Sequence, residues 1–161
     1  MKKTVMVLAT TALVFSAGEA MAGGSATANV NYQVQAVNEI TATDATPALV
    51  INSATAGGGY TDATATGTYS ITTNGSNKKI SAALTANMPT GLTLQALATA
   101  AGGGAATTQT LTQTAVDLVT GIGPNSTPNL NITFTLHDDG TAVLEGSQQT
   151  AVLTLTIADG V

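Results

Sequence analysis

The side chains able to do chemistry in this chain are few, and its single histidine stands beside two acids. The 161 residues include one histidine and no cysteine. His137 is therefore the only candidate base for a serine nucleophile and the only candidate imidazole ligand. No Gly-x-Ser-x-Gly elbow places a serine for attack. We expect a solvated histidine at a strand end and no enzymatic activity; an exported hydrolase, testable with His137→Ala, is the alternative.

Asp138 and Asp139 follow the histidine directly and precede Gly140. Their carboxylates could contribute to a Ca²⁺ site, with Asp62 or Glu145 supplied from elsewhere. Ca²⁺ takes six or more oxygen ligands, and the chain lacks the D-x-[DN]-x-[DN]-G loop that provides them locally. An Asp-Gly pair is also typical of a tight hairpin turn. The sequence favours the turn, and we predict no metal and no cofactor.

Charge and aromatic content exclude several classes of partner. Four basic against nine acidic residues give a net charge of −5. Beyond the first three residues the only cations are Lys78 and Lys79, which we expect to be a solvated strand edge that discourages aggregation. So acidic a chain lacks the phosphate contacts that dominate nucleic-acid affinity, and an anionic membrane surface is disfavoured as well. Aromatic residues are 3% of the chain, which leaves few stacking platforms for a ligand.

The start of the chain has the pattern of a processing signal. Lys2 and Lys3 precede an apolar run over 5–16, and Ala20-Met-Ala22 supplies a small–x–small cleavage motif. The alternative, a retained membrane anchor, is weaker because Gly18 interrupts the apolar run early. We predict a signal peptide over 1–22, a single secreted domain over 23–161, and no stable membrane insertion after cleavage.

Behind that cleavage site lies the most regular pattern in the chain. The apolar residues Ala28, Val30, Tyr32, Val34 and Ala36 alternate with the amides Asn29, Asn31, Gln33 and Gln35. A period of two places the apolar groups on one face of an extended strand and the amides on the other. We predict a strand over 28–36, close to the N-terminus of the mature protein.

Other short alternating segments follow, separated by turn residues. Strands are predicted over 48–51, 68–73, 79–85, 92–96, 130–136, 141–144 and 151–157. Asn74-Gly75 predicts a turn because both residues tolerate positive φ, Pro124 and Pro128 are expected to bracket a loop, and 110–122 is a strand or a bent connection. Glycine-rich loops are expected over 54–59 and 98–108. Seven to eight short strands without a convincing helix predict an all-β, immunoglobulin-like β-sandwich.

Three stretches carry a family resemblance. They are Tyr69-Ser-Ile-Thr-Thr-Asn-Gly-Ser-Asn-Lys-Lys-Ile-Ser-Ala, Met88-Pro-Thr-Gly and Ala151-Val-Leu-Thr-Leu-Thr-Ile. Together they resemble small exported bacterial β-sandwich proteins, and the last is similar to the closing strand of fimbrial subunits and spore-coat-U-type domains. The resemblance implies a pilus-like structural role. The chain departs from typical chaperone–usher pilins, which carry a cysteine pair.

The leading functional prediction is a subunit of an extracellular filament or surface layer that associates with itself or with other surface subunits. Its free alternating strand would add to the open sheet edge of a neighbour. In the plainer alternative, the strand pairs within its own domain, at the edge of a monomeric sandwich. A second hypothesis is a monomeric secreted recognition or adhesion module using the loops 54–62 and 98–108, although small flexible residues make poor binding hot spots.

Overall fold

The computed structural model describes residues 25–43, 48–142 and 148–161, and all regular structure within these ranges is β. In the described part of the chain there is no helix of the length and apolarity needed to cross a membrane. The predicted signal peptide over 1–22 lies outside the described residues. The chain divides into two compact units, 1–33 and 34–161, and every strand of the described residues belongs to the second.

The described strands are of two kinds. Seven have six or more residues: β1 (Asn38–Thr43), β4 (Ala63–Thr73), β5 (Lys78–Leu84), β6 (Leu92–Ala98), β9 (Val116–Ile122), β10 (Asn125–Asp138) and β11 (Leu153–Asp159). Four have two residues each: β2 (Ala54–Thr55), β3 (Gly59–Tyr60), β7 (Ala105–Ala106) and β8 (Gln109–Thr110).

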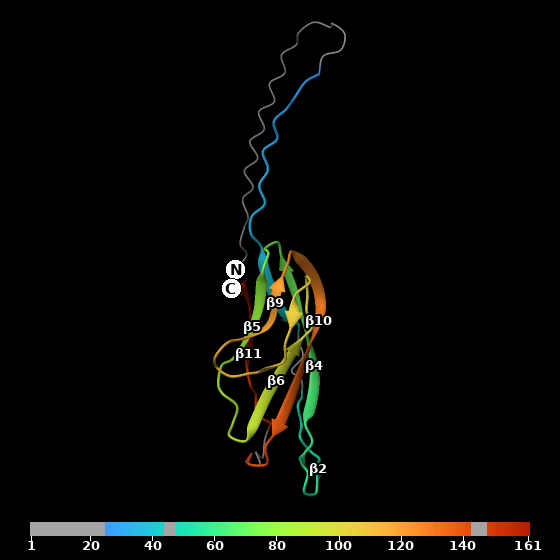
Figure 1. Ribbon diagram of the computed structural model, residues 1–161, viewed down its shortest axis with the longest axis vertical. Helices are drawn as coiled ribbons and strands as arrows, with labels where there is room; N and C mark the ends of the chain where they lie inside the picture. Colours follow the sequence, from blue (N-terminus) through green and yellow to red (C-terminus); the bar gives the residue numbers. More distant parts are fainter. Residues whose placement is uncertain (1–24, 44–47, 143–147) are drawn as a thin grey trace. The chain divides into compact units, whose positions relative to one another are not determined.

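These strands form two antiparallel sheets that pack together as a sandwich, plus one small hairpin. The first sheet has the order β1-β4-β10-β6-β8, the second has the order β11-β5-β9-β7, and β2 pairs with β3. Figure 1 shows β4, β10 and β6 as neighbouring strands of the first sheet. The all-β prediction is thereby confirmed, and the packed sheets are consistent with the predicted sandwich.

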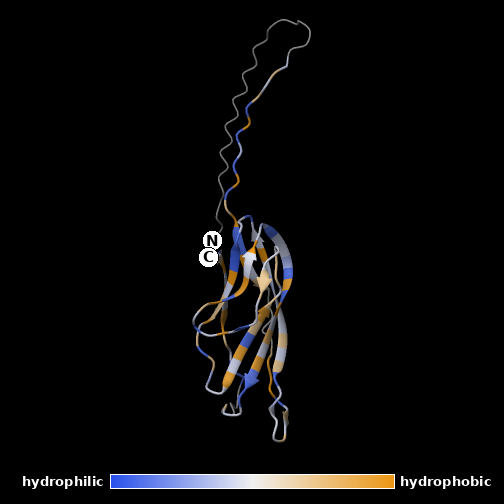
Figure 2. Cartoon of the chain, in the orientation of Figure 1, coloured by the Kyte–Doolittle hydropathy of each residue, from blue (hydrophilic) through white to orange (hydrophobic). Residues whose placement is uncertain are grey.

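The core follows from the period of two. In β5 every second residue is buried, from Lys78 to Leu84, because alternate side chains of a strand point to opposite faces. The same alternation of apolar and polar residues along the strands is visible in Figure 2. The largest fully buried side chains are Tyr69, Ile80, Leu118, Val119 and Ile122. They come from both sheets and lie between them.

The predicted loop between Pro124 and Pro128 is wrong. β10 begins at Asn125 and runs through Pro128, pairing with β4 on both sides of a register shift between Thr127 and Leu130. Asn129 adopts a φ of 55° at that shift. Proline cannot donate to a ladder, and a bulge is a position where a strand tolerates it. The strand therefore continues past a residue that normally interrupts one.

Two further predictions need correction. Residues 48–51 form no strand, although Leu49 packs against the core and Val50 is exposed as alternation would predict. The loop over 54–59 is instead the β2–β3 hairpin, closed by a hydrogen bond from Gly58 N to Thr55 O of 2.8 Å, with positive φ at Gly57 and Gly59.

The remaining segments differ less from expectation. Residues 141 and 142 are not in a strand, and the rest of the strand predicted over 141–144 lies outside the described residues. In the stretch over 110–122, predicted to be a strand or a bent connection, β8 ends at Thr110 and β9 forms Val116–Ile122, and the loop over 98–108 contains β7. The closing strand is present, shifted by two residues to 153–159.

Candidate functional site: the N-terminal segment and the open sheet edges

Residues 25–37, called here the N-terminal segment, carry the chain's most regular pattern yet form no strand. The strand predicted over 28–36 is therefore not formed, and the first strand, β1, begins at Asn38. Val30, Tyr32 and Val34 are 79%, 92% and 81% exposed, and Ala28 and Ala36 are exposed too. An exposed stripe of large apolar side chains is typical of an interaction surface rather than of a finished monomer.

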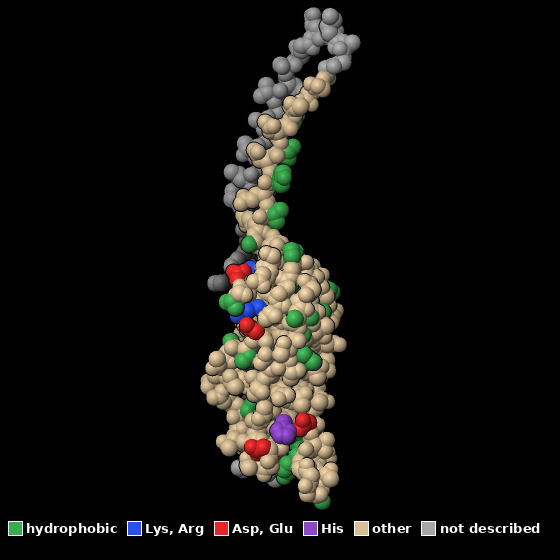
Figure 3. All heavy atoms as spheres, viewed as in Figure 1, with side chains coloured by type: hydrophobic (Ala, Val, Ile, Leu, Met, Phe, Trp, Pro, Cys, Tyr) green, Lys and Arg blue, Asp and Glu red, His purple; other side chains and the backbone are tan. Residues whose placement is uncertain are grey.

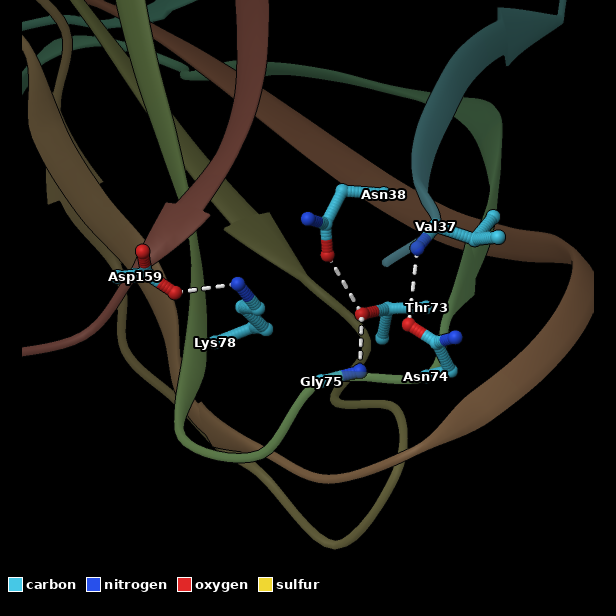
Figure 4. A network of polar contacts seen from close by, with 7 residues as sticks. All are labelled: Val37, Asn38, Thr73, Asn74, Gly75, Lys78 and Asp159. Atoms are coloured by element: carbon cyan, nitrogen blue, oxygen red, sulfur yellow. Dashed lines mark hydrogen bonds and ion pairs between the residues drawn. The ribbon is translucent and has the colours of Figure 1, made fainter. Parts of the chain in front are cut away.

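The last residues of the segment are held by one side chain. Asn74 Oδ1 accepts a hydrogen bond from Val37 N at 2.8 Å, and Asn74 Nδ2 donates to Gln35 O at 2.6 Å. The backbone N–H of Asn74 also donates to Val37 O at 3.2 Å. The side-chain amide thus offers one acceptor and one donor, as a peptide unit of a neighbouring strand would. Figure 4 shows the Asn74–Val37 contact.

A buried threonine next to Asn74 in the sequence also contacts the start of β1. Thr73 is 3% exposed. Its Oγ1 donates to Asn38 Oδ1 at 2.7 Å and accepts from Gly75 N at 3.1 Å. One hydroxyl therefore joins the first residue of β1 to the turn that follows β4 (Figure 4).

The predicted turn is present, but its chemistry differs from the prediction. Positive φ falls on Asn77, at 51°. Gly75 matters for space instead, because a Cβ there would lie 2.2 Å from Lys78 Cε. The Asn-Gly pair signalled a turn correctly, although the glycine serves the packing of a lysine and the asparagine serves the N-terminal segment.

The two lysines do not form the solvated edge that the sequence indicated. β5 lies between β11 and β9 in its sheet, so it is no edge strand. Lys78 is buried and pairs with Asp159 at the end of β11, while Lys79 Nζ lies 3.1 Å from Asp117 Oδ2 on β9. Each lysine therefore links β5 to one neighbour: Asp159 stands opposite Lys78, and Asp117 stands opposite Ser81, two residues along β5 from Lys79.

Two long sheet edges are open in the described part of the chain. β1 pairs with β4 alone and β11 pairs with β5 alone, whereas β8 and β7, at the other ends of the two sheets, have two residues each. β1 and β11 lie close together, so both long edges border the same side of the sandwich. Ile40 of β1 and Leu153 and Leu155 of β11 pack against the core but stay only partly buried.

His137 is exposed near the end of β10, as predicted, and it has a partner that the sequence did not reveal. Its Nδ1 lies 2.7 Å from Asp62 Oδ1. This hydrogen bond, and then the negative charge of Asp62, raises the pKa of His137 above its ordinary value. Figure 3 shows the histidine on the surface with acidic side chains on either side of it. The pair joins the start of β4 to β10 across 75 residues of sequence.

The two aspartates after His137 are occupied by their own turn. Asp138 Oδ1 accepts from Gly140 N at 2.8 Å. Asp139 Oδ1 accepts from Thr141 N at 2.9 Å and from Thr141 Oγ1 at 2.6 Å, and these bonds lower the pKa of Asp139. Within the described residues no group of three or more histidine or acidic side chains is placed to hold a metal ion, and Glu145 lies outside them.

The two loops considered for recognition lie at opposite ends of the sandwich. The β2–β3 hairpin precedes Ala63, which pairs with Leu136 at one end of the β4–β10 ladder. Gly102 O accepts from Gly123 N, beside the start of β10 at the other end of that ladder. Figure 1 likewise shows β2 at one end of the sandwich. The structure does not bring the two loops together into one surface.

One shallow cleft lies beside β6. It has a volume of about 450 Å³, and its lining runs from Asn87 and Met88 through the start of β6 to residues 110–114. None of its lining residues is ionisable, so the cleft offers no acid, base or charged ligand.

Comparisons of the chain with protein-family models, with curated proteins and with solved structures find no match. Function is therefore inferred from the chain's own residues and geometry.

Proposed function

We propose that this protein is a non-enzymatic structural subunit of an extracellular filament or surface layer. In this proposal, residues 28–36 of one copy add as a strand to an open sheet edge of the next copy. The observation that carries it is the N-terminal segment: alternating, exposed and unpaired in the described structure, yet anchored at its end by Asn74.

Strand addition suits what this segment contains. Residues 25–37 include no charged side chain, so pairing would bury no unpaired charge, a step that is strongly unfavourable. Ladder hydrogen bonds would supply affinity, and the alternate apolar side chains would supply specificity. Burial of exposed apolar area contributes about 25 cal/mol per Å², and three large apolar side chains of the segment are available for it.

The strand order supports an immunoglobulin-like acceptor. β1-β4-β10-β6 follows the A-B-E-D order of that fold, and β11 beside β5 corresponds to F beside C. β9 is an additional strand relative to this seven-strand pattern. It lies between β6 and β10 in sequence and pairs with β5. The position of strand G, next to F, is the free side of β11. An immunoglobulin-like subunit with that position open would accept a strand from outside.

The donated segment and the accepting edge consist of different residues, so a contact in which each copy donates to the next is head-to-tail. Head-to-tail contacts produce either closed rings or open filaments, according to the rotation between subunits. A chain without cysteine gains no disulfide to reinforce such an assembly. Backbone pairing between subunits would carry its strength. Secretion through the predicted signal peptide is part of the same proposal.

The test is electron microscopy of secreted material from the full chain and from a variant lacking residues 23–37. We expect filaments or sheets from the first and none from the second. A matched pair of variants separates the two faces of the segment. V30N/Y32N/V34N should abolish assembly, whereas N29S/N31S/Q33S should retain it. Filaments that survive the deletion would contradict the proposal.

The alternative, a monomeric recognition or adhesion module, finds less support. Its two loops lie at opposite ends of the sandwich, so they offer no shared surface. Size-exclusion chromatography of the mature protein separates the readings. A concentration-independent monomer favours the module, and a species larger than one subunit favours assembly.

A further inference from the structure

We propose that Asn74 is a self-modification site, at which deamidation of the side chain releases the end of the N-terminal segment from the body of the protein. The inference goes beyond the proposed function, because it concerns a covalent change within one chain and holds whether or not copies assemble. It follows from the residue after Asn74, from the contacts of the Asn74 side chain, and from the hydrogen bond on the nitrogen that attacks it.

The residue after an asparagine determines how easily the side chain reacts with the backbone. Asn74 is the only asparagine of the chain that precedes a glycine. Glycine has no Cβ and an adaptable backbone, so nothing shields the nitrogen of Gly75 from the side-chain carbon of Asn74. Asn74 is also exposed, so water reaches the site. Together these two conditions distinguish Asn74 from the other asparagines.

The reaction needs no reagent other than water. Gly75 N loses its proton to water or hydroxide and attacks Asn74 Cγ. The new N–Cγ bond closes a cyclic imide while the Cγ–Nδ2 bond breaks, and the side-chain nitrogen leaves as ammonia. A water molecule then opens the ring at either of its carbonyl carbons, which gives aspartate or isoaspartate at position 74. No step exchanges electrons with another molecule.

The folded structure acts on both reacting groups (Figure 4). Asn74 Oδ1 accepts a hydrogen bond from Val37 N at 2.8 Å, and such a donor stabilises the negative charge that this oxygen gains during attack. Gly75 N, in contrast, donates to Thr73 Oγ1 at 3.1 Å. A hydrogen bond to the protonated form of a group disfavours loss of its proton. Thr73 is 3% exposed, so bulk water does not compete for this bond, and Thr73 restrains the reaction.

The product cannot make the contact that the amide makes. Asn74 Nδ2 donates to Gln35 O at 2.6 Å, whereas a carboxylate only accepts hydrogen bonds. Deamidation therefore replaces a donor by a negatively charged oxygen that faces a carbonyl oxygen. The isoaspartate product also inserts a methylene into the backbone, which displaces the carboxylate from Val37. Gln35 is thereby released from the turn after β4.

Peptide mapping by mass spectrometry tests the site during incubation of the purified protein in mildly alkaline buffer. Deamidation replaces an NH₂ group by OH and so raises the mass, whereas the Asp-Gly pairs at Asp139 and Asp159 isomerise without a change in mass. Asn52, which is exposed and precedes Ser53, is the internal reference. We expect several-fold faster conversion at Asn74 than at Asn52. Equal conversion at the two asparagines would overturn the assignment.

A matched pair of variants at Thr73 tests the restraint. Thr73→Val removes the hydroxyl that binds Gly75 N, and Thr73→Ser retains it. We expect several-fold faster conversion at Asn74 in Thr73→Val and an unchanged rate in Thr73→Ser. Equal rates in the two variants would contradict the restraint. In denaturant both variants should convert alike, because the difference comes from a folded contact.

A second measurement covers any failure of Thr73→Val to fold, since Thr73 also donates to Asn38 Oδ1. The unaltered chain is incubated folded and in denaturant. Unfolding should accelerate conversion at Asn74 because it frees Gly75 N. Conversion that is no faster in denaturant would show that the folded structure does not restrain the reaction.

Two substitutions of Asn74 test the release. Asn74→Asp carries the carboxylate of the product, and Asn74→Gln keeps a donor and an acceptor while its longer side chain would have to close a larger ring, which forms far more slowly. In the monomer, NMR order parameters at Gln33, Gln35 and Ala36 should fall in Asn74→Asp and stay unchanged in Asn74→Gln. Conversion at position 74 should be lost in Asn74→Gln. Unchanged order parameters in Asn74→Asp would overturn the release.

Discussion

Asn74 binds both backbone groups of Val37. Asn74 Oδ1 accepts a hydrogen bond from Val37 N at 2.8 Å, and Asn74 N donates one to Val37 O at 3.2 Å. A third bond, from Asn74 Nδ2 to Gln35 O, extends the contact by two residues. The body of the protein thus holds Gln35 and Val37, at the end of the N-terminal segment. Such an anchor reduces the conformational freedom that the segment would lose on docking.

Replacing Asn74 tests the anchor. Asn74→Ala removes two side-chain hydrogen bonds at an exposed site, so we expect a loss of about 1 kcal/mol in the free energy of unfolding. Assembly should weaken by more than this, because the segment is no longer held in line with β1. Chemical denaturation and the critical concentration for assembly measure the two effects. Ser76→Ala, in the same turn, is the control and should change neither.

The exposed ion pair predicts a titration. Asp62 raises the pKa of His137 above 6.5, chiefly through their hydrogen bond. The pair therefore contributes stability below the unfolded-state pKa, and that contribution is lost as the pH rises through the higher folded-state pKa. In an NMR titration, Asp62→Asn should lower the pKa of His137 markedly. Asp138→Asn should lower it least, because Asp138 is the weakest contributor; equal shifts would contradict the assigned cause.

A buried phenol predicts loss of stability in alkali. Tyr69 is fully buried and its hydroxyl donates to Thr99 O. Burial raises the pKa of Tyr69 from 10.0 to about 12. The unfolded state therefore releases its proton first, and stability falls as the pH rises above the unfolded value. Denaturant midpoints measured from pH 8 to 11.5 should fall less steeply for Tyr69→Phe; parallel curves would show that other groups cause the loss.

Substitutions at two leucines distinguish the core from the proposed docking surface. Leu118 is fully buried, so Leu118→Ala should lower the free energy of unfolding by about 3 kcal/mol. Leu155 is only partly buried, and Leu155→Ala should lower it less. Assembly should show the opposite order once stability is accounted for, because an added strand would cover Leu155. A Leu155 variant that assembles normally would argue against β11 as the docking edge.

Strand pattern could be predicted from this sequence, but pairing could not. Alternation located the cores of β4, β5, β6, β10 and β11, because a period of two is a local property. It also placed a strand over 28–36, where the pattern is the most regular of all and the described structure has no pairing. Local alternation reports which face of a strand is apolar, and it does not report whether a neighbour lies alongside.

The side-chain contacts could not be predicted from the sequence for the same reason. The sequence predicts a turn at Asn74, and its bonds to Gln35 and Val37 span 39 and 37 residues. The partners of Lys78 and His137 lie 81 and 75 residues away. The sequence predicts a loop at Pro128 because proline usually ends a strand, and only the register with β4 reveals the bulge that accommodates it.

Hydrogen exchange in the segment tests the central claim most directly, because the claim concerns backbone pairing. The exchange rates of amides 28–36 are measured in the assembled protein and in the monomer obtained from V30N/Y32N/V34N. Strand addition predicts strong protection at alternate residues of the segment in the assembly and rapid exchange in the monomer. An assembly in which these amides exchange as rapidly as in the monomer would contradict the account, whatever its appearance in the microscope.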